Sequence, residues 1–342
     1  LFTNDAKEYG ATFDLSQENL TQKIVLNYLE EDTAIIGSEA FMNPASSEET
    51  TLGYFFARDL GGFHLDFGIR HDRIKKKGSL TRLESHEEHH DEEHEDEDHE
   101  DEDHEGEDHD EEHGEEHGET EFFDNDINST SFALSLGREI SDSLNVSLGF
   151  ARVERAPSVV ELYMNGPHLS TGKYEVGDTN LATEVSKNFD LSFKYEQDGL
   201  FGTINFYRND VDDYIYLFDE TEDEHEEHEH EDDHGGLTLA NYLQKDAEFE
   251  GYELELGKTF DLARGSLTVS FARDDVSAEF SDGTNVPRIV SARNIYSISY
   301  SENDDFEIKL KFKDVERQSD ISIVETATSS YQMFNLNVVK VF

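Results

Sequence analysis

Apolar residues alternate with polar or small residues along most of this chain. Phe132, Leu134 and Leu136 are separated by Ala and Ser, and residues 144–151 and 306–313 repeat the same alternation. A period of two with one apolar face is typical of a β-strand. We therefore predict strands at residues 7–15, 20–31, 50–59, 62–74, 127–139, 143–155, 187–197, 200–217, 238–257, 265–280, 286–301, 305–317 and 328–342.

The predicted connections alternate between short and long. Short turns fall at residues 16–19, 59–62, 141–143, 197–199, 261–265 and 301–305. Long loops fall at 32–49, 75–126, 156–186 and 218–237, and moderate ones at 281–285 and 318–327. This alternation predicts an all-β fold, an antiparallel transmembrane β-barrel with its long loops on one side. A soluble lectin-like or propeller fold is the alternative, but such a fold has no reason to keep its long connections at one end.

Composition narrows the possible functions. The 342 residues carry a formal charge of −54, with no Cys and no Trp. Nucleic acid is not an expected partner, because its phosphates require Lys and Arg. No apolar run reaches the roughly 18 residues of a transmembrane helix, and no catalytic constellation stands out, so we do not expect an enzyme. Leu1 falls within an apparent strand, which suggests that the natural amino end is missing.

Thirteen of the sixteen histidines lie in two segments built almost wholly of His, Asp, Glu and Gly, at residues 84–118 and 219–234. Imidazole and carboxylate groups are zinc ligands, so the composition favours divalent metal capture. A solvated, disordered acidic loop without a specific partner is the alternative. The histidines are His86, His89, His90, His94, His99, His104, His109, His113 and His117 in the first segment, and His225, His228, His230 and His234 in the second.

Three segments carry a resemblance to a known family. Residues 155–181 read RAPSVVELYMNGPHLSTGKYEVGDTNL, residues 35–56 read IIGSEAFMNPASSEETTLGYFF, and residues 286–294 read VPRIVSARN. Together they resemble the TonB-dependent outer-membrane receptors, and within them the zinc-uptake (ZnuD-like) subgroup. The resemblance implies a 22-stranded barrel, of which about 13 strands are present. The plug and its TonB-contacting box have no counterpart here, so we expect a fragment from the later part of a barrel.

The resemblance also implies a site and a function. The alternation of connections puts the loop at residues 156–186, with His168, on the outer side, and the resemblance favours His168 as a metal ligand. Further ligands would come from Glu161, Glu175, Asp178, the His-rich segments or the missing plug. The resemblance implies a monomeric zinc importer in the outer membrane of a Gram-negative bacterium, surrounded by outer-membrane lipid. The TonB-ExbB-ExbD complex would drive import through the plug.

The sequence is also compatible with two functions other than zinc import. Haem receptors of the same fold carry a His between an Arg-Ala-Pro box and an Asn-Pro-Asn-Leu-like box. Here His168 lies between Arg155-Ala156-Pro157 and the degenerate Asp178-Thr179-Asn180-Leu181. The third possibility is a surface metal buffer or adhesin that transports nothing, in which the two His-rich segments bind all the metal.

Overall fold

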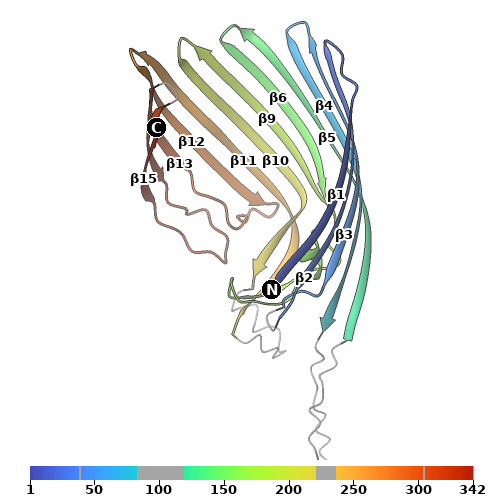
Figure 1. Cartoon of the computed structure of the whole chain (residues 1–342). Helices are drawn as coiled ribbons and strands as arrows, with labels where there is room; N and C mark the ends of the chain where they lie inside the picture. Colours follow the sequence, from blue (N-terminus) through green and yellow to red (C-terminus); the bar gives the residue numbers. More distant parts are fainter. Residues whose placement is uncertain (38–39, 83–118, 221–235, 303–304, 342) are drawn as a thin grey trace, which may run out of the picture.

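The structure, a computed structural model, describes residues 1–37, 40–82, 119–220, 236–302 and 305–341. Thirteen strands form one antiparallel meander that curves like part of a barrel wall, with β1 and β15 at its two edges (Figure 1). These are β1 (Phe2–Asp14), β2 (Leu20–Ile35), β3 (Ala45–Leu60), β4 (Phe63–Arg82), β5 (Glu119–Ser141), β6 (Leu144–Arg155), β9 (Glu184–Gln197), β10 (Leu200–Asp219), β11 (Thr238–Leu262), β12 (Gly265–Phe280), β13 (Arg293–Glu302), β14 (Phe306–Val315) and β15 (Tyr331–Lys340).

The segment between β6 and β9 adds three short elements outside this meander. They are helix α1 (Val159–Tyr163) and strands β7 (Asn165–His168) and β8 (Lys173–Val176). β7 and β8 form an antiparallel pair, and β8 also pairs in parallel with the start of β11. No helix in the described part of the chain is long and apolar enough to cross a membrane.

Strand register separates two chemically different faces. Leu136, Leu148, Leu191, Phe206 and Tyr252 are consecutive partners across β5, β6, β9, β10 and β11, and they form one apolar row. A second aromatic row continues across the next strands through Phe271, Tyr296, Phe312 and Phe334, with ring centroids 4.7–6.0 Å apart. The opposite face carries polar and small residues. An apolar outer face and a polar inner face are typical of a membrane barrel wall.

The alternation of short turns and long connections is confirmed by the strand order. The turns that follow β1, β3, β5, β9, β11 and β13 lie at one end of the sheet. The long connections lie at the other end, which faces downward in Figure 1. Strand pairing therefore places Arg82 and Glu119, which bound residues 83–118, at the same rim as Asp219 and Thr238. We call this end the long-loop rim.

Several predicted boundaries are wrong. The strand predicted from residue 286 begins only at Arg293, because Val286 folds inward and is buried against Ala247, Ala278 and Phe280. The loop predicted at 75–126 is shorter, since β4 and β5 remain paired as far as Arg82 and Glu119. The loop predicted at 32–49 shrinks to residues 36–44. The loop predicted at 156–186 contains regular structure, which the alternation could not reveal.

Candidate metal site

Residues 156–183 form a cap that folds back onto the polar face at the long-loop rim. Helix α1 begins with a capping box, in which the Ser158 hydroxyl accepts from the Glu161 N–H and the Glu161 carboxylate accepts from the Ser158 N–H. This reciprocal pair satisfies two of the orphan amide donors at the helix start. The cap is apolar underneath, where Leu162 and Tyr163 pack with Met42, Ala45 and Ile215. Residues from β3 and β10 thus meet the same small core.

Tyr163 anchors the cap against β4. Its side chain is fully buried, stacks on Phe123 at 6.0 Å between centroids, and donates a 3.2 Å hydrogen bond to the carbonyl of Lys76. Burial raises the pKa of Tyr163 to about 12, with a smaller contribution from the charge of Asp124. Gly78 lies under the ring, and a Cβ there would stand 2.3 Å from the ring carbon Cδ2. The cap needs a glycine at that position.

Arg155 fastens the start of the cap to the sheet. Its guanidinium donates to both carboxylate oxygens of Glu161 at 3.1 and 2.9 Å, and to the carboxylate of Glu184 at 3.3 and 3.0 Å. Glu161, a predicted metal ligand, is therefore occupied by Arg155 and by the helix start. A carboxylate held in this way orients the cap in the described conformation.

His168 and Glu175 face each other across the β7–β8 hairpin. The two groups lie 2.9 Å apart, His168 Nδ1 to Glu175 Oε1, and the Thr171 hydroxyl donates to the same oxygen at 2.9 Å. An ionised carboxylate only accepts, so Nδ1 is the donor of this pair, and in the neutral imidazole Nε2 then keeps its lone pair. The imidazole also stacks on Phe41, with ring centroids 4.6 Å apart.

The pair is built from a buried carboxylate and a half-buried imidazole. The Glu175 side chain is 4% exposed, whereas that of His168 is 29% exposed. No described residue makes a hydrogen bond to His168 Nε2. A metal-ligating histidine commonly donates its other ring N–H to a carboxylate, which fixes the tautomer and the ring direction. The geometry therefore gives Glu175 an orienting position and leaves Nε2 open to a metal.

Asp178 is held differently from Glu175. Its Oδ1 accepts from the backbone N–H of Asn180 at 2.8 Å and from the Asn180 side chain at 3.1 Å, which closes a local turn. Across the described residues, no group of three or more His, Cys, Asp or Glu is placed to hold a metal ion. The structure brings together His168 and Glu175, but not Glu161 or Asp178 with them. All thirteen histidines of the two His-rich segments lie outside the described residues.

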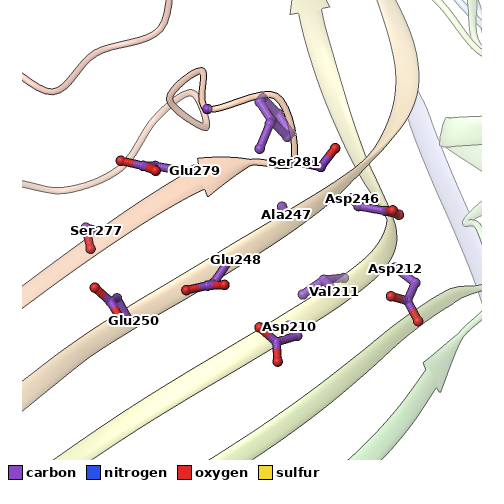
Figure 2. A pocket seen from close by; sticks show the side chains of 12 residues that line it. Asp210, Val211, Asp212, Asp246, Ala247, Glu248, Glu250, Ser277, Glu279 and Ser281 are labelled. Atoms are coloured by element: carbon purple, nitrogen blue, oxygen red, sulfur yellow. The ribbon is translucent and has the colours of Figure 1, made fainter.

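An acidic pocket of about 480 Å³ lies along β10, β11 and β12. Figure 2 shows the carboxylates of Asp210, Glu248, Glu250 and Glu279 along its wall. These residues share the face of Phe206 and Tyr252 and lie closer to the long-loop rim. Arg208 forms ion pairs with both Asp210 and Glu248. The pocket is thus an outward-facing charged band rather than part of the His168 site.

The fold and face pattern define an outer-membrane barrel wall, and the sequence comparison defines the family. The family described as TonB dependent receptor-like, beta-barrel, matches residues 2–340, and the chain belongs to it. Members of this family are transporters of the Gram-negative outer membrane, not enzymes, and they import metals, siderophores or haem. The expected class, location and absence of enzymatic activity are therefore confirmed.

Solved structures show the same fold at low sequence identity. The copper transporter OprC matches with a TM-score of 0.67 and 17% identity over 98% of this chain and 48% of its own. The hemophore receptor HasR of Serratia marcescens, solved with its hemophore HasA and heme, matches with a TM-score of 0.60 and 14% identity over 98% of this chain and 53% of its own. The ferric-catecholate receptor Fiu of K12 E. coli matches with a TM-score of 0.63 and 12% identity over 98% of this chain and 48% of its own. The chain spans about half the length of these proteins.

Proposed function

We propose that this chain is the metal-capturing part of an outer-membrane receptor that imports zinc with energy from the TonB complex. The observation that carries the proposal is the His168–Glu175 pair. A half-buried imidazole is held by a buried carboxylate through Nδ1, and its Nε2 has no hydrogen-bond partner among the described residues. The pair sits in the cap, at the rim where the strands flanking both His-rich segments end.

The donor set favours zinc among divalent ions. Imidazole nitrogen suits zinc, copper and nickel, whereas calcium and magnesium prefer shells made wholly of oxygen. The chain has no Cys, so thiolate ligands are absent. The formal charge of −54 attracts cations toward the rim, most strongly at low ionic strength. The copper transporter OprC shares the fold at only 17% identity, so this likeness does not indicate which metal is bound. The argument for zinc rests on the ligands at the site.

The mechanism has two stages. The His-rich segments raise the local concentration of metal through many weak contacts, and His168 then holds one ion more tightly. A tight zinc site needs about four donors, and His168 supplies one, so we expect the remaining donors to come from the plug that the family resemblance implies and not from the two His-rich segments. Plug movement driven by the TonB complex would release the ion inward, as the resemblance to the family implies.

Calorimetric titration of zinc into the intact receptor in detergent tests this function. The variants are wild type, a deletion of residues 84–118 and 221–234, and that deletion combined with His168→Ala. The second deletion spares Asp219 and Glu220, which make contacts within the described fold. We expect one tight site to survive the deletion and to vanish with His168→Ala. If the deletion alone removes all binding, the chain is a surface metal buffer rather than an importer.

A haem receptor is the second candidate, and the single open Nε2 of His168 favours it. One imidazole stacked on Phe41 is a suitable axial ligand for haem iron. HasR, which shares the fold, was solved in complex with heme. Haem titration followed by absorbance distinguishes the two, since a band lost on His168→Ala would support haem and an unchanged spectrum would support metal alone.

A further inference from the structure

Lys173 lies directly opposite His168 in the β7–β8 hairpin, and its ammonium group is paired with Asp219. Register pairs the Cα atoms of His168 and Lys173, and directly opposed side chains project from the same face with Cβ atoms about 5 Å apart. Lys173 Nζ donates to Asp219 Oδ1, and both side chains are mostly buried, at 18% and 22% exposure. A cationic side chain is thus the immediate neighbour of the proposed metal ligand.

Asp219 is the last residue of β10 and connects the cap to the rim. Besides Lys173, its Oδ1 lies 3.6 Å from the guanidinium of Arg288, which also donates to the carbonyl of Leu217. One carboxylate therefore neutralises two cations that belong to different loops. Without it, the Lys173 charge would be left unpaired beside a site proposed to hold a divalent cation, and Arg288 would lose this ion-pair partner.

The backbone holds β8 in the same place. β12 ends at Phe280, opposite Ala247, so the edge of β11 before Ala247 has no β12 partner. β8 covers part of this edge, pairing in parallel with Thr238–Asn241. Since these hydrogen bonds do not depend on Lys173, the ion pair is not needed to keep β8 in position. The main effect of the Lys173–Asp219 ion pair is to fix the position of the Lys173 ammonium group.

We propose that Asp219 is a positioning residue for the metal site, because it draws the Lys173 ammonium away from His168 and keeps the position beside Nε2 open to a divalent cation. The inference rests on the proposed function of His168. It differs from a purely structural role in one measurable way. If the pair only fastened β8, removing either partner would have the same effect. If Asp219 acts by holding the charge, removing Asp219 is much worse than removing Lys173.

The test is a double-mutant cycle on zinc affinity, using Asp219→Asn, Lys173→Met and the double variant in the intact receptor lacking residues 84–118 and 221–234. We expect Asp219→Asn to weaken zinc binding at the tight site at least about 10-fold, which is about 1.4 kcal/mol, because an ammonium group without its partner a few ångströms away repels a divalent ion. We expect Lys173→Met to change the zinc affinity of the tight site less than about 3-fold. The double variant should bind like Lys173→Met, and added salt should reduce the Asp219→Asn defect.

Asp282→Asn is the matched control, since Asp282 forms a Lys–Asp pair with Lys245 at the same rim but has no contact with the hairpin. It should leave zinc affinity within about 2-fold of the parent. Equal losses for Asp219→Asn and Lys173→Met, or no loss for Asp219→Asn, would overturn the inference. His168→Ala is measured in parallel. A tight site that survives His168→Ala overturns the proposed function itself, whereas its loss together with an unaffected Asp219→Asn overturns the positioning role alone.

Discussion

At the scale of single residues, the important group is the carboxylate of Glu175. It is nearly inaccessible and accepts from His168 and Thr171, so it is already satisfied without a metal. In the neutral imidazole, this contact fixes the proton on Nδ1 and the direction of the ring. Glu175 is therefore expected to act through His168 rather than as a ligand.

The Glu175→Gln variant tests this orienting role. A neutral amide retains the shape but loses the charge, so zinc affinity at the tight site should fall about 10- to 100-fold, as is usual for carboxylates behind a ligating His. Asp178→Asn is the matched control, because Asp178 closes a local turn with Asn180 and should leave affinity nearly unchanged. Calorimetric titration of both variants gives the answer. A larger loss for Asp178→Asn than for Glu175→Gln would contradict the assignment.

The sequence could predict His168 but not its environment. The Asn-Gly-Pro-His segment and the family resemblance singled it out. The orienting position of Glu175, the stacking on Phe41 and the Lys173–Asp219 pair depend on hairpin register and on contacts between distant segments. Lys173 and Asp219 were missed for this reason. No local pattern marks an ion pair that spans 46 residues.

At the scale of elements, the cap depends on close contact between α1 and β4. Tyr163 lies flat over Gly78 and is held there by its hydrogen bond to Lys76. Alanine would normally be favoured over glycine in a strand by about 0.5–1 kcal/mol. Here its Cβ would overlap the ring, and such overpacking costs about 1–3 kcal/mol.

We therefore expect Gly78→Ala to loosen the cap and to make residues 156–183 more accessible to limited proteolysis. Gly68→Ala is the control, since Gly68 lies on the same face of β4 and a Cβ there meets nothing within 4 Å. It should leave the cleavage rate unchanged. Equal cleavage of the cap in both variants would show that Tyr163 does not anchor it.

Strands were predictable and the cap was not, for a physical reason. In strands that lie between lipid and a polar interior, apolar and polar residues must alternate, so the sequence pattern predicts where the strands are. Helix α1, β7 and β8 are short, and their form depends on contacts with the wall, such as the parallel pairing of β8 with β11. The segment at 286–292 alternates enough to suggest a strand, but burial of Val286 pulls it into a loop.

At the scale of the whole molecule, acidification should separate metal capture from folding. Zinc needs neutral imidazole, and histidines among many carboxylates should protonate more readily than free histidine. Zinc affinity should therefore fall between pH 7.5 and 5.5. The fold should persist, because the carboxylate of the Asp282–Lys245 pair in the rim loops titrates at lower pH than histidine. Hydrogen bonds from Lys245 and Thr284 hold the pKa of Asp282 well below its usual range.

The lowered pKa of Asp282 makes the fold respond to acid at a lower pH than zinc binding does. A carboxyl whose pKa is depressed in the folded state stabilises the fold above its unfolded pKa of about 3.9, and this contribution is lost only as pH falls further. Titrations at the two pH values, with circular dichroism and thermal unfolding alongside, make the comparison. Unchanged zinc affinity, or unfolding already at pH 5.5, would count against histidine ligation at the rim.

The most direct test of the account is anomalous X-ray diffraction at the zinc edge, from crystals of the intact receptor grown with zinc. The account predicts a strong peak about 2.0–2.1 Å from His168 Nε2, with Glu175 still hydrogen-bonded to Nδ1. Zinc peaks found only at other positions, with none within ligand distance of His168, would contradict it.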